Sequence, residues 1–101
     1  MKRSITLMLW FISAGMTSLF AQQTINGTVI SADDNQPLPG VNVVVKGTEV
    51  GVITDLNGAY TIEITDNAKA LVFSFVGMQS QEVAINGQTE INVALETEVT
   101  G

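Results

Sequence analysis

The residue types that most often carry enzyme chemistry are scarce in this 101-residue chain. It contains no histidine and no cysteine, which removes the commonest general base and every Ser-His or Cys-His nucleophile pair. Lys46 and Lys69 could in principle activate a hydroxyl group, but both lie at expected strand ends and are interpreted as solvated. Glu63 and Glu82 could be neighbours on a sheet face, yet nothing indicates the cleft that paired catalytic carboxylates need. We therefore expect no catalytic residue and no enzyme activity.

The segment at residues 55–58 resembles a fragment of a calcium loop. Asp55, Asn57 and Gly58 match its first positions, but a full loop ends in a bidentate glutamate at the twelfth position. The twelfth residue from Asp55 is Asp66, and the residues between them have the pattern of a strand. We interpret the segment as a tight turn and predict neither a metal site nor a cofactor.

Two further patterns could indicate binding sites, but neither is interpreted as one. Residues 26–28 match the N-glycosylation pattern, but they lie inside an expected strand, and we treat the match as chance. Exposed aromatic side chains could stack on sugar rings. However, Tyr60, Phe73 and Phe75 lie at strand positions, where packing in the core is the expected use.

The first 21 residues have the pattern of an export signal. Lys2 and Arg3 precede an apolar run at residues 5–20, which is shorter than the roughly 20 apolar residues of a spanning helix. Ala21 suits the position before a signal-peptidase cut, and no cysteine follows for lipoprotein processing. We expect a helical signal peptide at residues 1–21, with a retained anchor as the alternative.

The chain from residue 22 onward is strongly acidic. It carries two lysines against ten acidic residues, a net charge of −8. Such a surface should repel nucleic acid and anionic membranes, so no nucleic-acid partner is expected. Because cysteine is absent, the domain must be held together by one hydrophobic core.

Alternation of apolar and polar residues predicts a seven-stranded antiparallel β-sandwich. The expected strands are residues 24–31, 41–46, 50–54, 59–64, 70–76, 81–85 and 90–95. Asn-Gly pairs at residues 57–58 and 86–87 predict two hairpin turns. Residues 96–101 are polar and are expected to fray.

Three residue-level expectations accompany this strand pattern. Gly27, inside the first strand, indicates a bulge or a close backbone contact. Leu38, between Pro37 and Pro39, should tuck its loop onto the core. The strand at residues 70–76 is apolar on both faces, which predicts a central position in its sheet.

Several sequence blocks follow one order along the chain. They are residues 25–29, residues 36–48 with PLPGVNVVVKGT, residues 51–60 with TDLNGAY, and residues 71–78. This order resembles the carboxypeptidase-regulatory-like domain, in the version found after the signal peptide of SusC/RagA-type TonB-linked outer-membrane receptors of Bacteroidota.

The resemblance implies a transthyretin-like sandwich at residues 22–96, exported to the periplasmic side of the outer membrane. Residues 97–101 would begin a linker to a TonB-box segment, a plug and a β-barrel, none of which this sequence includes. Implied partners are the receptor's own plug and barrel and the TonB energy-transducing machinery. A SusD-like surface lipoprotein would be a partner only of the full receptor.

The motif residues are interpreted as specifying the fold rather than performing a reaction, because they fix turns, φ angles or core positions. They are Gly27, Pro37, Leu38, Pro39, Gly40, Val41, Lys46, Gly47, Thr48, Thr54, Asp55, Gly58, Tyr60, Phe73 and Gly77. The leading hypothesis is a non-catalytic accessory domain of a glycan or nutrient importer. The alternative is a carbohydrate- or surface-binding module of another exported protein, and a third reading is the accessory part of a peptidase.

Overall fold

The computed structural model describes residues 22–99, so the expected signal peptide at residues 1–21 lies outside the described residues. Seven strands form within the described part, in the positions where apolar and polar residues alternate. They are β1 (Gln23–Ser31), β2 (Asn42–Val45), β3 (Gly51–Ile53), β4 (Ala59–Ile64), β5 (Ala70–Ser74), β6 (Gln81–Ala84) and β7 (Val93–Leu95). Residues 22–99 include no helix with the length and apolar character needed to cross a membrane.

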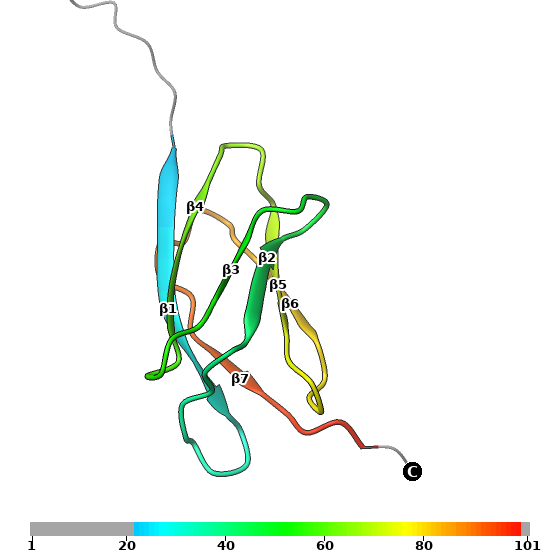
Figure 1. Cartoon of the computed structure of the whole chain (residues 1–101). Helices are drawn as coiled ribbons and strands as arrows, with labels where there is room; N and C mark the ends of the chain where they lie inside the picture. The colour runs from blue at the N-terminus through cyan, green and yellow to red at the C-terminus, as the bar shows by residue number, and fades with distance from the viewer. Residues whose placement is uncertain (1–21, 100–101) are drawn as a thin grey trace, which may run out of the picture.

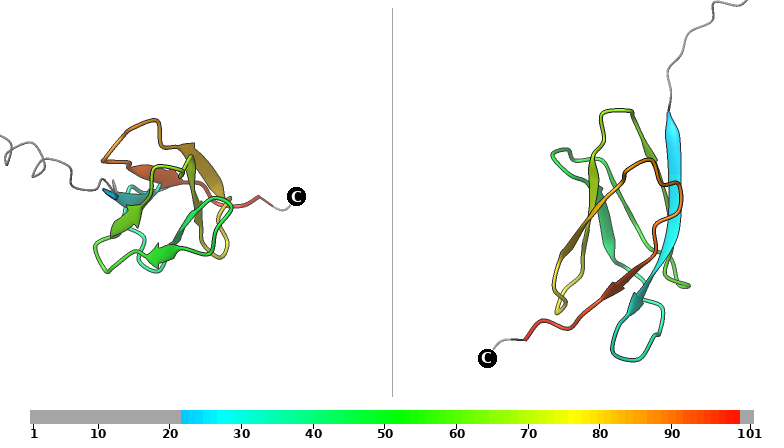
Figure 2. Two further views of the ribbon diagram at one scale, coloured as in Figure 1. Left: turned by 90° about the horizontal axis from the view of Figure 1, so that it is seen from above. Right: turned by 180° about the vertical axis from the view of Figure 1, so that it is seen from behind.

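The strands form two sheets that face each other across the core (Figures 1 and 2). One sheet has the order β4-β1-β7 and the other the order β3-β2-β5-β6. The predicted sandwich is therefore confirmed. One pair departs from the antiparallel expectation, because β1 and β7 run parallel, with Val29 beside Val93 and Ser31 beside Leu95.

The two predicted Asn-Gly hairpins are wrong, although the turns themselves form. Residues 55–58 join β3, which pairs with β2, to β4, which pairs with β1 in the other sheet. The turn that contains Asn86 likewise precedes a crossing from β6 to the sheet that contains β7. Asn86 and Gly87 have φ angles of 45° and 77°, as such a turn requires. Local turn chemistry reverses the chain, but it does not decide which sheet receives the next strand.

The core lies between the two sheets. Phe73 of β5 is fully buried, and its ring meets that of Tyr60 edge to face at 5.6 Å and 74°. The strand β5 lies between β2 and β6, so its predicted central position is confirmed. It ends at Ser74 rather than at Val76, which is 85% exposed. The core consists of Ile25, Val29, Val41, Val43, Val45, Tyr60, Ile62, Ile64, Leu71, Phe73, Ile85, Ile91, Val93 and Leu95.

The residues after β7 stay attached to the fold. The Gln79 N–H donates to the Glu96 carbonyl at 2.8 Å, and the Glu98 N–H donates to the Gly77 carbonyl at 3.0 Å. Fraying was expected from Glu96 onward because the tail is polar. That expectation is wrong for residues 96–98, because backbone pairing does not depend on side-chain polarity.

Candidate functional site

Two motif blocks, residues 37–41 and residues 54–58, meet where the chain crosses between the sheets. Thr54 is buried, and its hydroxyl donates to the Leu38 carbonyl at 2.6 Å and accepts the Val41 N–H at 2.9 Å. Leu38 packs against the core, as the sequence predicted. The Thr54 hydroxyl is therefore used to hold the crossover.

Asp55 closes the turn that follows. Its Oδ1 accepts the N–H of Asn57 at 2.8 Å and of Ala59 at 2.9 Å, as an Asx turn does. Gly58 follows with a φ of 73°, and a Cβ there would lie 2.5 Å from the Val29 carbonyl oxygen. The structure thus places the Asp55 carboxylate in a turn. Residues 22–99 contain no group of three or more acidic side chains arranged to hold a metal ion.

The prolines line the outside of the same crossover. Pro37 forms an isolated bridge with Ile30, and the Leu38 N–H donates to the Val29 carbonyl at 3.0 Å. Pro39 leads into Gly40, whose φ of 84° is in the region that favours glycine. The loop is thereby joined to β1.

Gly27 leaves room for the segment that precedes β7, and Tyr60 forms a hydrogen bond to it. A Cβ on Gly27 would collide with the Ile91 carbonyl, so the close backbone contact predicted at this glycine is present. The Tyr60 hydroxyl donates to that same carbonyl oxygen at 2.7 Å. Burial raises the pKa of Tyr60 to about 12, because the phenolate would lose its hydration. Tyr60 therefore has a packing role.

The remaining motif residues lie elsewhere. Gly47 and Thr48 form the turn between β2 and β3, where the Thr48 hydroxyl donates to the Val45 carbonyl at 3.0 Å. Lys46 was expected to be solvated. It remains more than half exposed, but its Nζ pairs with Glu82 at 2.9 Å. Gly77 lies in the turn between β5 and β6, with a φ of 80°.

The proposed neighbours Glu63 and Glu82 are not brought together. Glu63 belongs to β4 and Glu82 to β6, which are in different sheets. The acid pair considered from the sequence is therefore absent, because β4 and β6 do not share a sheet face.

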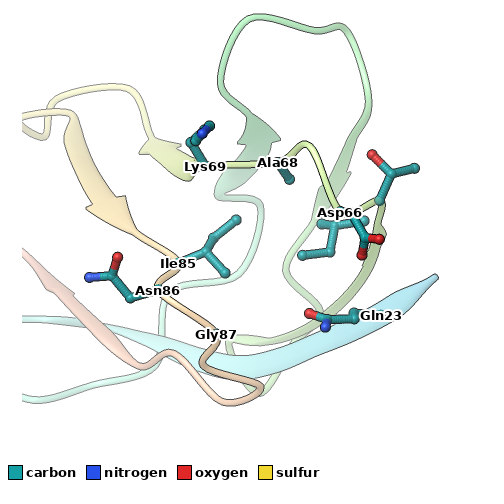
Figure 3. A pocket seen from close by; sticks show the side chains of 9 residues that line it. Gln23, Asp66, Ala68, Lys69, Ile85, Asn86 and Gly87 are labelled. Atoms are coloured by element: carbon teal, nitrogen blue, oxygen red, sulfur yellow. The ribbon is translucent and has the colours of Figure 1, made fainter. Parts of the chain in front are cut away.

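An open hollow of about 300 Å³ lies beside the start of β1, between the loop at residues 64–69 and the turn at residues 85–87. Figure 3 shows Ile85 projecting into it, while Lys69 and Asn86 project away. The polar side chains around it do not converge on a common point, as a specific small-molecule site requires. Sequence reasoning missed this hollow because three separate segments form it.

The sheet edges offer a different kind of site. On one side, the Gln81 side chain donates to the Ala94 carbonyl at 3.2 Å and joins β6 to β7. On the other side, β3 and β4 end their sheets. Near β3, Val50, Ile53 and Leu56 are 52%, 64% and 85% exposed. The sequence pattern did not identify these residues as a surface feature, because Val50 and Ile53 also suit a buried strand.

Comparison with known proteins agrees with this architecture. In a type II cohesin–X-dockerin complex from Acetivibrio cellulolyticus, a chain matches with a TM-score of 0.51 at 22% identity. The match covers 70% of this chain and 52% of that chain. It supports the sandwich fold alone.

Relatives found by sequence similarity identify the family of the chain. TonB-dependent receptor P39 of Formosa agariphila is 39% identical over 92% of this chain, and TonB-dependent receptor SusC of Bacteroides thetaiotaomicron is 35% identical over 79%. The chain spans only 9% and 8% of these relatives. The model of the CarboxypepD_reg-like domain matches residues 25–100. The chain therefore belongs to the CarboxypepD_reg-like domain family, in the form that occurs within TonB-dependent receptors.

Proposed function

We propose that this domain is a non-catalytic, N-terminal accessory domain of a SusC/RagA-type TonB-dependent importer. It is exported by the segment at residues 1–21 and lies on the periplasmic side of the outer membrane. Residues 97–101 lead toward the plug and barrel. The observation that carries the proposal is the similarity to TonB-dependent receptors, which extends over most of this chain.

The proposed mechanism is protein–protein contact. Polar groups at the motif positions are engaged within the fold: Thr54 and Asp55 hold turns, and Tyr60 binds a backbone carbonyl. What the domain presents outward is an acidic surface and the open sheet edge at β3. These features suit contact with the receptor's plug and barrel or with the TonB machinery rather than chemical turnover.

Deletion of residues 22–95 from a full receptor that carries this domain tests the contact role. We expect the barrel to insert and to bind its substrate, whereas energised uptake falls. Uptake should be compared at equal receptor levels in the membrane. Uptake equal to that of the intact receptor would contradict the proposal. Loss of substrate binding with normal insertion would instead favour a carbohydrate- or surface-binding module.

A further inference from the structure

The hydrogen-bond register of β3 leaves one side of its backbone unpaired. The Thr54 N–H donates to the Val41 carbonyl, and the Val45 N–H donates to the Val50 carbonyl. In an antiparallel pair, bonded positions alternate along the strand. Val52, opposite Val43, is therefore bonded to β2, whereas the N–H and C=O groups of Gly51 and Ile53 point away from β2. No strand of residues 22–99 lies on that outer side of β3.

The edge strands β4 and β6 each carry a charge or a covering contact that β3 lacks, although the Thr61 backbone also faces outward on β4. On β4, the Ala59 N–H and carbonyl are both occupied by Asp55, and Glu63 places a charge on the strand. On β6, Glu82 carries a charge and Gln81 reaches across to β7. Charges and covering segments are the usual means by which sheet edges avoid pairing with other chains. β3 has no charged residue, and Ile53 is 64% exposed.

The charge around β3 defines the partner that would fit. Glu49 precedes the strand and Asp55 follows it, and both are exposed. Glu63 lies on β4, the edge of the other sheet on the same side. A second copy of this domain, with a net charge of −8 from residue 22 onward, would bring these acids against its own. A basic segment would be attracted instead.

We propose that β3 is a docking edge to which a partner protein adds a β-strand, and that this strand alternates basic and apolar residues. The partner backbone pairs with Gly51 and Ile53, its apolar side chains cover Ile53, and its basic side chains lie near Glu49 and Asp55. This inference rests on the proposed contact role, because it names the surface and the chemistry through which contact is made.

A peptide of about ten residues that alternates lysine and valine is a suitable probe, with an alternating glutamate–valine peptide as the charge control. The isolated domain, residues 22–101, can be used because it contains both sheets and the buried core cluster between them. We expect the basic peptide to shift the amide resonances of Gly51 and Ile53 and to slow their hydrogen exchange. The acidic peptide should leave both unchanged. Equal binding of the two peptides, or binding elsewhere, would overturn the proposal.

Ile53→Pro removes only the outward N–H and the exposed side chain, so it should leave the β2–β3 pairing intact. Thr61→Pro is the matched control, because the β1–β4 register places the Thr61 N–H on the outer side of β4. We expect Ile53→Pro to weaken peptide binding about tenfold and Thr61→Pro to have no effect. The reverse result would assign docking to β4 and overturn the proposal.

Ile53→Lys keeps the N–H and places a like charge against the peptide, so it also weakens binding even if the proline variant does not fold. A dimer of the free domain with protected Gly51 and Ile53 amides would show self-pairing in place of partner docking. In the full receptor, reduced uptake on deletion but normal uptake with Ile53→Lys would overturn only the docking edge. Normal uptake on deletion would overturn the contact role itself.

Discussion

Where β6 and β7 meet, the side of the sandwich is closed by hydrogen bonds, whereas the side bounded by β3 and β4 is open. On the closed side, Gln79 and Glu98 take part in backbone pairing with residues from the other segment, and Gln81 bridges the strands. On the open side, Gly51 and Ile53 have no such pairing, and Ile53 is exposed to solvent. The two sides share one core. The difference is that hydrogen bonds join the two sheets on the closed side, whereas Gly51 and Ile53 keep unpaired backbone groups on the open side.

Truncation of Phe73, a core residue that lies between the two sides, should have the largest effect on the free energy of unfolding. Phe73→Ala leaves a cavity at a fully buried position, and we expect a loss of about 3–5 kcal/mol. Denaturant unfolding measures this loss, which is large against a total of about 5–15 kcal/mol. Val76→Ala is the control, because Val76 is exposed and its loss should stay within about 0.5 kcal/mol. Equal midpoints for the two variants would show that the sides do not share this core.

High pH should destabilise the fold at the hydrogen bond from Tyr60 of β4 to the Ile91 carbonyl, in the segment before β7. The pKa of Tyr60 is raised from 10.0 to about 12 in the folded domain. The unfolded chain therefore loses this proton first, and the free energy of unfolding falls as the pH rises from about 10 to 12, by about 2–3 kcal/mol. Unfolding of the parent and of Tyr60→Phe across this range measures the effect. An equally steep fall in Tyr60→Phe would contradict this origin.

Loss of the Thr54 hydroxyl should weaken the crossover next to the open edge. Thr54→Val leaves the buried Val41 N–H and the Leu38 carbonyl without their partner, so we expect a cost of about 1–3 kcal/mol. Thr48→Val makes the same substitution in the exposed turn between β2 and β3, where water can replace the hydroxyl, and it should cost less. A larger cost at Thr48 would reverse the importance we assign to the two turns.

The smallest effect is expected for the ion pair that joins the β2 end to β6. Lys46 and Glu82 are 57% and 51% exposed, so Lys46→Ala should change the free energy of unfolding by about 0.2–1 kcal/mol. The change should diminish in high salt. A larger, salt-independent loss would show that the lysine stem, rather than its charge, stabilises this edge.

Period-2 alternation was sufficient to predict seven strands and the core positions of Phe73 and Tyr60. Apolar residues on both faces of the strand at residues 70–76 predicted the central position of β5. The glycine at position 27 predicted a bulge or a close backbone contact, and the structure shows the close contact with Ile91. The assignment of strands to the two sheets was less predictable from the sequence. The turns at residues 57–58 and 86–87 look like hairpin turns, but long-range packing directs each following strand to the other sheet. The exposure of Ile53 depends on that same pairing, and sequence alone does not reveal it.

Amide hydrogen exchange of the free domain tests the contrast between the two sides most directly. The amides of Gln79 and Glu98, which are bonded across the closed side, should exchange slowly. Those of Gly51 and Ile53 should exchange rapidly, while Val52 between them is protected by β2. Slow exchange at Gly51 and Ile53 in the free monomer, or rapid exchange at Gln79 and Glu98, would contradict the account.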